Sequence, residues 1–500
     1  MSMTSFTTDN KIFKSFGFAG SAAAVALTYL TLKYNDRVVF DAPRPNTVHK
    51  KGLPLVGSTF SLLANLEEIN HFYSMPLKLL VRKRCNTISA VGLPRGVQSI
   101  DPLNIEHVLK HNFENYVKGV LFHNSTVHLL GHGIFNANGA QWRYQRKAAS
   151  LIFNVKNFRD HFTDVFVKEL VLVQGIFNNA IENKSVVDFH EIMYKFTLDS
   201  FVPFAESFDE LQKNSFDRFM NFMEPVNRKF SEIFMPWKPT VASHQKVIDE
   251  FANSVIQKRR AQLAAGEVHK DLLSRFMETT NENGEPLNDK ELRDTIMNFI
   301  IAGRDTTAQT LSWLLYNVML HPEVEEKLVQ EIRTHVPEEL EQDSPALYEA
   351  IKDMKYAYAV LYETLRLHPS VPVNQKQALK DDILPDGTPL KSGDVFIWST
   401  YSLGRNKEIW GDDAKEFKPE RWFTEEGDLK RESQGKWPAF HAGPRVCLGQ
   451  NLATLEALVA VCVLLKRYKF SLVPNQNVTY QVSLTLPMKY GLKVTIDPRA

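Results

Sequence analysis

The chain has 500 residues, of which 44% are hydrophobic and 23% are charged, as expected for a packed globular protein. Lysine and arginine number 59 against 58 aspartates and glutamates, and this net charge of +1 gives no support for a nucleic-acid partner. The three cysteines, Cys85, Cys447 and Cys462, are too few for a disulfide framework and have no zinc-site spacing. We therefore expect a folded part in a reducing compartment, with any cysteine chemistry carried by a single residue.

An uncharged segment from Phe16 to Leu32 lies near the start of the chain, between basic residues. As a helix it would be about 25 Å long, close to the roughly 30 Å of a bilayer core. We predict that residues 1–35 form an uncleaved single-pass membrane anchor, with the body in the cytosol and the endoplasmic reticulum as the location. A cleaved signal peptide is the alternative, for which the small residues Ala22 to Ala26 are suited. Residues 36–57, which contain several prolines and glycines, are predicted to form a hinge.

Residues 58–500 contain no repeat and no Gly/Ser linker, so we predict one large domain, mainly α with a small β part. Apolar periodicity predicts a long helix from about Asp289 to Leu320 and another from about Tyr356 to Leu367. Strand-like runs come late in the chain, at Val395 to Ser399 and at Leu484 with Leu492 to Ile496.

The segment from Phe440 to Gly449 reads FHAGPRVCLG and bends the chain around Cys447, and an apolar helix is predicted immediately after it, over Gln450 to Leu465. Cys447 would then lie at a helix N-terminus, where free amides, the helix dipole and Arg445 lower the pKa of a thiol. A thiolate held in this way suits a metal bond. A small buried hydrophobe is the commoner role of a lone cysteine, and a hydrolase nucleophile would need more than His441 beside it.

Five residues of this loop match every fixed position of the pattern Phe-x-x-Gly-x-Arg-x-Cys-x-Gly, namely Phe440, Gly443, Arg445, Cys447 and Gly449. On this match the chain resembles the cytochrome P-450 superfamily of haem-thiolate monooxygenases. The resemblance implies haem b as the cofactor and Cys447 as the axial ligand to its iron. Because further motifs follow the family order along the whole chain, it also implies the cytochrome P-450 fold, with a single catalytic domain over residues 58–500.

Ala302, Gly303, Asp305 and Thr306 lie in the middle of the long predicted helix. Glycine in a helix interior costs about 1 kcal/mol relative to alanine, and its missing side chain would open a groove beside the helix. An acid followed by a hydroxyl can hold water there and pass protons, although a tolerated glycine beside a solvent-facing aspartate is the alternative. The segment resembles the family's oxygen-activation motif, which implies Asp305 and Thr306 as the proton-delivery pair, with Ala302 and Gly303 beside the haem.

Trp142 and Arg146 are one helical turn apart and resemble the Trp-x-x-x-Arg of the family helix that contacts the haem propionates. The resemblance implies that both residues and Arg445 bind these carboxylates, for which fixed cations and N–H donors are suited. Many members carry a further arginine or histidine in the strand after the next motif. Ser370 to Asn374 has neither residue, and Lys376 is an open candidate for this role.

Glu363 and Arg366 are three residues apart on a predicted helix and therefore share a face. Such pairs are common on solvated surfaces. The later segment from Phe417 to Trp422, however, resembles the family's meander motif. The resemblance implies that Arg421 joins the pair in a buried network behind the cysteine loop, with a structural rather than a catalytic role.

The acid–alcohol pair favours activation of O2 over rearrangement of a peroxide. The chain contains no flavin or iron–sulfur segment, so the resemblance implies electrons from NADPH through a partner flavoprotein reductase. Arg143 and Lys147, on the same predicted helix as Trp142, are candidates for its docking face or are ordinary solvated charges.

The substrate class rests on a closer resemblance, to the fungal and plant fatty-acid and alkane hydroxylases, which oxidise long chains at or near the terminal carbon. The segments that carry it are Gly133 to Asn136, Leu367 to Pro372, Tyr401 to Arg405 and Trp410 to Ala414. The 33 phenylalanines suit an apolar tunnel or equally a core, and Phe113 to Phe122 and Leu484 to Met488 are candidate pocket segments. Hydroxylation of another lipophilic substrate (a sterol, terpenoid or xenobiotic) and a non-enzymatic haem sensor are the alternatives.

Overall fold

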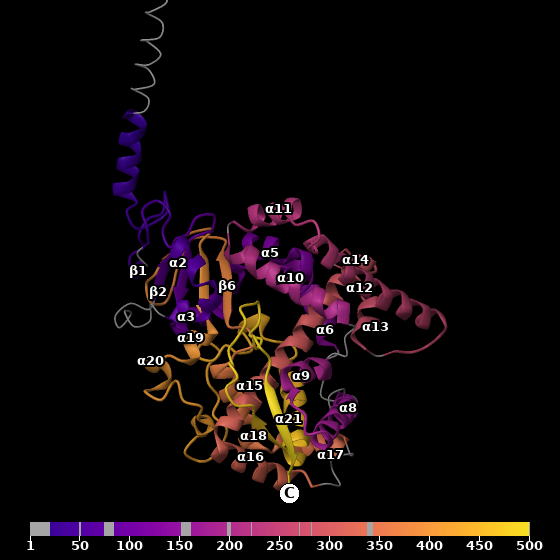
Figure 1. Cartoon of the computed structure of the whole chain (residues 1–500). Helices are drawn as coiled ribbons and strands as arrows, with labels where there is room; N and C mark the ends of the chain where they lie inside the picture. Colours follow the sequence, from indigo (N-terminus) through magenta and orange to yellow (C-terminus); the bar gives the residue numbers. More distant parts are fainter. Residues whose placement is uncertain are drawn as a thin grey trace, which may run out of the picture.

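The structure is a computed structural model, and it describes residues 21–49, 52–74, 85–151, 162–197, 202–221, 223–269, 271–281, 283–337 and 344–499. Helices dominate these residues, and the strands form three small sheets (Figure 1). The expectation of a mainly α chain with a small β part is therefore confirmed.

The helices fall along the whole of the described chain. Their bounds are α2 Thr59–Ala64, α3 Ile69–Ser74, α4 Pro102–Glu106, α5 Val120–Leu130, α6 Gly139–Ser150, α8 Thr163–Glu182, α9 Phe189–Thr197, α10 Val202–Met220, α11 Glu224–Phe234, α12 Val241–Ala264, α13 Leu272–Met277, α14 Asp289–Ile300, α15 Thr306–Leu320, α16 Pro322–His335, α17 Ser344–Lys352, α18 Lys355–Leu367, α19 Thr400–Gly404, α20 Lys407–Trp410 and α21 Gln450–Arg467. Short 3-10 turns are η1 Leu66–Glu68, η4 Phe113–Asn115, η8 Pro419–Trp422 and η9 Gly443–Arg445, and π-helical turns are η3 His107–His111 and η6 Ile301–Asp305.

The largest sheet has six strands in the order β1-β2-β3-β9-β6-β4. Its strands are β1 Thr47–His49, β2 Cys85–Ile88, β3 Gly96–Ser99, β9 Val395–Ser399, β6 Val373–Ala378 and β4 Tyr116–Val117. A three-stranded sheet holds β10 Tyr468–Leu472, β11 Lys493–Pro498 and β5 Val187–Asp188, and a two-stranded sheet holds β7 Asp382–Ile383 and β8 Pro389–Leu390. At the edge of the large sheet, β4 pairs antiparallel with β6, which brings together two segments far apart in the sequence.

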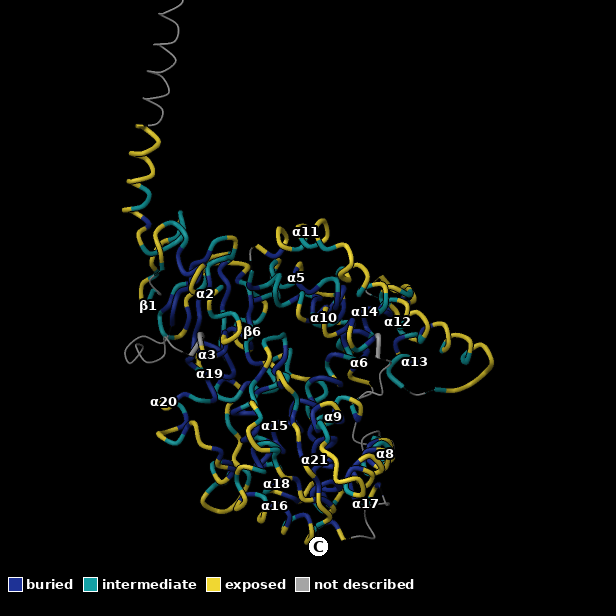
Figure 2. Tube along the Cα trace, viewed as in Figure 1, coloured by how far each residue is buried: buried dark blue, intermediate teal, exposed yellow. Residues whose placement is uncertain are grey.

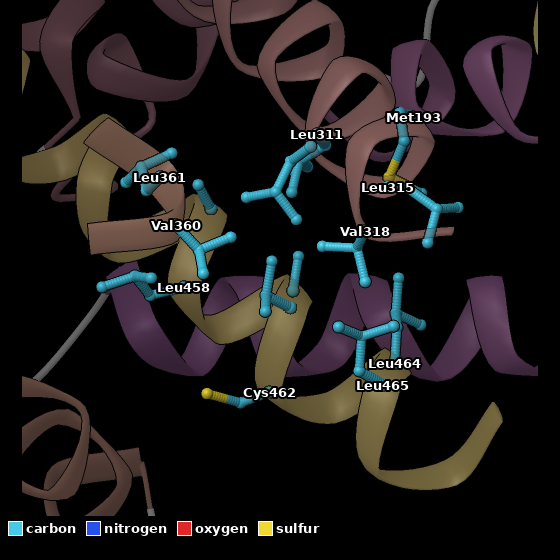
Figure 3. Close-up of a cluster of buried hydrophobic side chains, with 14 of the residues drawn as sticks. Met193, Leu311, Leu315, Val318, Val360, Leu361, Leu458, Cys462, Leu464 and Leu465 are labelled. Atoms are coloured by element: carbon cyan, nitrogen blue, oxygen red, sulfur yellow. The ribbon is translucent and has the colours of Figure 1, made fainter. Parts of the chain in front are cut away.

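The main hydrophobic core surrounds α15, α18 and α21. Figure 2 shows α15 and α21 as buried, and Figure 3 shows side chains of these helices pointing toward one another. From Thr454 to Leu465 every residue of α21 is buried, because this helix is apolar on all sides and is enclosed by others. Cys462 is fully buried in this core and Cys85 is fully buried in β2, so neither is exposed for chemistry.

The long helix predicted from Asp289 to Leu320 is confirmed, and it begins and ends at the predicted residues. The π-helical turn η6 separates α14 from α15 within it. It begins at a capping box in which the Asn288 side chain accepts from the Glu291 amide and the Glu291 side chain accepts from the Asn288 amide. It ends before Pro322, which cannot continue a helix. The predicted helices at Tyr356 to Leu367 and Gln450 to Leu465 are confirmed as α18 and α21.

The strand expected around Leu484 is wrong, because Leu484 lies in a loop outside the described strands. In this loop the backbone of Leu486 bonds to the side chains of Gln309 and Trp313 instead of to a neighbouring strand.

Residues 1–20 of the predicted anchor, including the start of its apolar run at Phe16, lie outside the described residues. Residues 21–33 form a helix that projects from the body, with Val25 and Leu32 exposed (Figure 1). Within the described ranges no helix is both long enough and apolar enough to cross a membrane. Further along, β1 lies within the predicted hinge and pairs with β2, so part of that segment joins the large sheet.

Candidate active site

The loop around Cys447 is fixed by backbone hydrogen bonds and by one glycine. The amide of Cys447 donates to the carbonyl of Phe440 at 2.8 Å, and the amide of Val446 donates to the carbonyl of Gly443 at 3.0 Å. Gly443 has a φ of +61°, and a Cβ at this position would lie 2.1 Å from the carbonyl oxygen of Leu109. Only glycine fits this turn, so the loop closes tightly three residues before α21 begins.

Cys447 is exposed on part of its surface, and protein surrounds the rest of it. Burial raises the pKa of its thiol, while a hydrogen bond from the Gly449 amide and the charge of Arg146 lower it. The net direction corrects the expectation of a lowered pKa, because the desolvation of the sulfur outweighs the loop's favourable dipoles. Arg146 rather than Arg445 is the cation that acts on the sulfur.

Four basic side chains gather beside the loop: Lys118, Lys376, His441 and Arg445. Burial is the main cause that lowers the pKa of Lys118 to about 7 and that of Arg445 to about 10. The pKa values of Lys376 and His441 lie well below their ordinary values, first because of burial and then because of the neighbouring cations. In each group the positively charged form is disfavoured, as expected where basic groups are buried together.

The cluster fits a ligand that carries carboxylates. Across the described ranges no carboxylate forms an ion pair with Lys118, Lys376, Arg146 or Arg445. The Nζ of Lys376, which is 1% exposed, and the Nε of Arg445 are buried without a hydrogen-bond partner. Such orphaned donors are costly unless a ligand satisfies them. Haem carries two propionates, so these residues and the accessible sulfur of Cys447 fit the cofactor that the sequence implies.

Trp142 and Arg146 lie on α6 next to this cluster. The Arg445 guanidinium lies 4.5 Å from the centroid of the Trp142 ring, and its Nη2 donates to the carbonyl of Ala137 at 2.7 Å. The structure therefore brings together the three residues expected to bind propionates and adds Lys376, whose role the sequence left open. Lys118 was missed, although it lies within the segment from Phe113 to Phe122 that was singled out for the pocket.

The π-helical turn η6 contains Ala302, Gly303 and Asp305. Gly303 is exposed although the helix around it is buried, and a Cβ added there would have no atom within 4 Å. Thr306 follows the turn, and its Oγ1 donates to the carbonyl of Ala302 at 2.6 Å. The helix is thus open at Gly303, next to the hydroxyl of Thr306. A small molecule could approach the helix at this point.

Asp305 faces away from this opening, toward α10. It is 1% exposed, and its carboxylate accepts hydrogen bonds from Gln212 at 2.7 Å and from Arg304 at 2.9 Å. Burial is the main cause that raises the pKa of Asp305 to about 7. Arg304 also pairs with Asp209, whose side chain is 58% exposed, so a chain of polar groups joins Asp305 to the surface. The two residues of the expected pair therefore lie on different sides of the helix.

Glu363, Arg366 and Arg421 form the buried network that the resemblance implied. The Arg366 guanidinium donates to Glu363 through Nε and Nη2, both at 2.7 Å, and neither side chain is exposed. Glu363 also accepts from Arg421 at 3.1 Å and from the Trp422 indole at 3.0 Å. Arg366 binds the carbonyls of Ala414 and Glu416 in addition, so the network fixes the meander to α18.

The comparisons with known proteins agree with this geometry. A family model described as Cytochrome P-450 matches residues 91–494. Cytochrome P-450 704B1 of Arabidopsis thaliana is 35% identical over 90% of this chain and 95% of its own length. Cytochrome P-450 monooxygenase cyp1 of Mycosarcoma maydis is 35% identical over 93% of this chain and 78% of its own length. Cytochrome P-450 86B1 of Arabidopsis thaliana is 36% identical over 80% of this chain and 77% of its own length. The chain therefore belongs to the cytochrome P-450 family and is a monooxygenase that uses haem b and receives electrons from a partner reductase.

Proposed function

We propose that this monooxygenase hydroxylates long-chain aliphatic substrates, fatty acids first and alkanes by extension, at or near the terminal carbon. The resemblance to the plant and fungal hydroxylases of such chains favours this class. The structural observation that carries it is the apolar surface near the open turn at Gly303. Ile300 and Leu484 pack there against a buried hydrophobic cluster whose residues come from α5, α10, α12, α14 and η6. Such walls suit an aliphatic chain, whose binding is driven by removal of apolar surface from water.

Bound haem supplies the activation of O2, with electrons that originate from NADPH. Cys447 would hold the iron, while Lys118, Lys376 and Arg445, with Trp142 and Arg146 on α6, would hold the propionates. Thr306, whose hydroxyl donates to Ala302 at rest, lies where a proton can be delivered to the open side of the helix. Asp305, whose pKa is raised to about 7, can hold or release a proton near neutral pH on the opposite side.

The experiment is a spectroscopic titration of the full chain with fatty acids of increasing length. Reduced protein under carbon monoxide should show the strongly red-shifted Soret band of thiolate ligation, and Cys447→Ala should lose it. Long-chain acids should shift the iron from low to high spin, and products hydroxylated near the chain end should follow with reductase and NADPH. A normal carbon monoxide band without a spin shift for any chain length would refute the substrate class, and a sterol or terpenoid panel would come next.

We also propose that the reductase docks on the face of α6 that carries Arg143 and Lys147. Both side chains are exposed, and Arg143 pairs with Glu114, whose side chain is itself 74% exposed. Exposed cations on the helix that carries Trp142 would steer an acidic partner toward the haem side of the molecule.

The location we propose is the endoplasmic reticulum membrane, with residues 1–35 as a single-pass anchor, residues 36–57 as the connection and residues 58–500 as a cytosolic catalytic domain. The uncharged segment from Phe16 to Leu32 supports it, as does the projecting helix of residues 21–33. A second support is α11, an exposed amphipathic helix at the same upper end of the molecule in Figure 1.

A further inference from the structure

The loop from Thr485 to Met488 is held by side chains of α15 in addition to backbone pairing, in which the Gln481 amide donates to the carbonyl of Pro487 at 2.8 Å and Tyr480 bridges to Met488. The Gln309 amide nitrogen donates to Thr485 Oγ1 at 2.9 Å, and the amide of Leu486 donates to Gln309 Oε1 at 2.9 Å. The Trp313 indole donates to the carbonyl of Leu486, also at 2.9 Å. Gln309 is 1% exposed and Leu486 is fully buried, so water cannot replace these bonds.

Gln309 uses its side-chain amide fully at this position. In addition to the two bonds to the loop, its Nε2 donates to the hydroxyl of Tyr194 on α9 at 2.9 Å. A primary amide offers two N–H donors and one carbonyl acceptor, and all three are engaged with buried partners. This pattern fixes the orientation of the amide and excludes the flipped one, in which the Leu486 amide would face an N–H group.

A histidine closes the other end of the loop. The amide of Met488 donates to His190 Nε2 at 3.1 Å, so this nitrogen carries no proton and Nδ1 donates to Ser312 Oγ at 2.8 Å. Burial lowers the pKa of His190 to about 4, so the ring stays neutral and accepting across the physiological range. The loop is therefore fastened at both ends to buried groups of α9 and α15.

Leu484 immediately precedes the fastened residues, so the conformation of the loop determines the position of the Leu484 side chain. It is half-buried, and it packs against the same buried cluster as Ile300 of α14, a cluster that includes Ile301, two residues before Gly303. Gln309 lies one helical turn after Thr306 on α15. The bonds of Gln309 thus connect the helix that carries the open turn to the loop that carries Leu484.

We propose that Gln309 is a positioning residue that holds the Thr485–Met488 loop and thereby fixes Leu484 as a wall that selects which carbon of the substrate is oxidised. The inference rests on the proposed function for the nature of the substrate, but the fastening of the loop does not depend on it. A wall held by two buried bonds from one side chain can exclude neighbouring carbons, whereas a mobile leucine would let the substrate chain slide.

The test is Gln309→Leu in the full-length holoprotein, with Gln330→Leu on the exposed face of α16 as the matched control. Hydrogen exchange resolved to single amides should show the Leu486 amide exchanging at least about tenfold faster in Gln309→Leu, with α21 unchanged. The ratio of the main hydroxylation product to its neighbours should fall at least about fivefold, while the carbon monoxide band keeps its position and intensity. The control variant should match the wild type in all three measurements.

Unchanged exchange at Leu486 would overturn the fastening, and faster exchange with an unchanged product ratio would overturn the positioning role. If Gln309→Leu does not fold, Thr485→Val serves as the second variant, because it removes one bond only. It should lower the ratio of the main product to its neighbours by a smaller factor. The failure of the proposed substrate class can be distinguished from the failure of the proposed role of Gln309. A wild-type protein that oxidises no fatty acid would refute the substrate class, and the same ratio would then be read on the substrate found to shift the spin state.

Discussion

Glu456 lies in the middle of the apolar helix α21 and is 9% exposed. The hydroxyl of Thr307, the residue after Thr306, donates to its carboxyl group. Burial raises the pKa of Glu456 to about 8, and no cation contributes to the shift. The folded protein therefore carries a neutral carboxylic acid here at pH 7, between the helix of the cysteine loop and the helix of the open turn.

Glu456→Gln should remove a pH dependence of stability. Because the folded-state pKa lies above the ordinary 4.5, the unfolded chain loses its proton first, and the native state loses stability as pH rises from about 4.5 to about 8. The wild type should lose up to ~1.4 kcal/mol per pH unit relative to Glu456→Gln in this window. Urea unfolding of both proteins at pH 5 and pH 8 measures it, and parallel curves would show that Glu456 is ionised in the fold.

Lys376→Met should separate the stability of the apoprotein from its affinity for haem. Removing a buried amino group that has no hydrogen-bond partner should stabilise the apoprotein by about 1–3 kcal/mol. The same change should speed the loss of haem to an acceptor apoprotein, because a propionate loses its cation. Lys407→Met, at an exposed lysine of α20, should change neither quantity. An apoprotein destabilised by Lys376→Met would contradict the role we assign.

At the scale of elements, two pairs with the same spacing differ in their surroundings. On α18 the pair Glu363 and Arg366 is fully buried, and on α17 the pair Glu349 and Lys352 is about half exposed. Arg366→Met should destabilise the protein by about 3–5 kcal/mol, because it removes the cation that binds the buried Glu363 carboxylate through two hydrogen bonds. Lys352→Met should leave the urea midpoint unchanged. Equal effects of the two substitutions would mean that the network does not fasten the meander.

A substitution at Gly303 tests the role of the open turn in stability and in substrate binding. Gly303→Ala should stabilise the protein by about 0.5–1 kcal/mol, because alanine suits a helix better and the added Cβ meets no atom within 4 Å. The methyl group should also narrow the opening beside Thr306 and weaken the spin shift with fatty acids. Thermal unfolding and substrate titration measure the two effects, and a loss of stability would show that η6 needs glycine for its backbone.

The elements that the sequence predicted well are those whose signals are local. The long helix is marked by its capping residues and by Pro322, and the cysteine loop by its spacing. The cation cluster could not be found in this way, because Lys118 and Lys376 meet only through the pairing of β4 with β6, where Val117 lies opposite Gln377. Leu484, which precedes the loop held by Gln309, was likewise mistaken for part of a strand, since the backbone of Leu486 bonds to distant side chains.

At the scale of the whole molecule, exposed apolar side chains gather on α11, which Figure 2 shows as largely exposed. They recur at helical spacing on one face, at Val226 (58% exposed), Phe230 (54%), Ile233 (68%) and Phe234 (59%). Arg228, Lys229 and Glu232 lie between them in the sequence, and Arg228 pairs with Glu224 and Glu232. A helix with one apolar face beside charged residues suits the interface of a bilayer.

This face predicts that membrane binding has two separable parts. Deletion of residues 1–35 should lower sedimentation with anionic vesicles but not abolish it, because on this proposal α11 would still bind the lipid through its apolar face. In that shortened protein, Phe230→Ser with Phe234→Ser should weaken binding further by about tenfold or more, since each half-exposed ring loses roughly 1 kcal/mol of transfer into lipid. Val268→Ser, at a residue 84% exposed after α12, should have no effect. If the double substitution leaves vesicle binding of the shortened protein unchanged, residues 1–35 alone carry the attachment and α11 faces another partner.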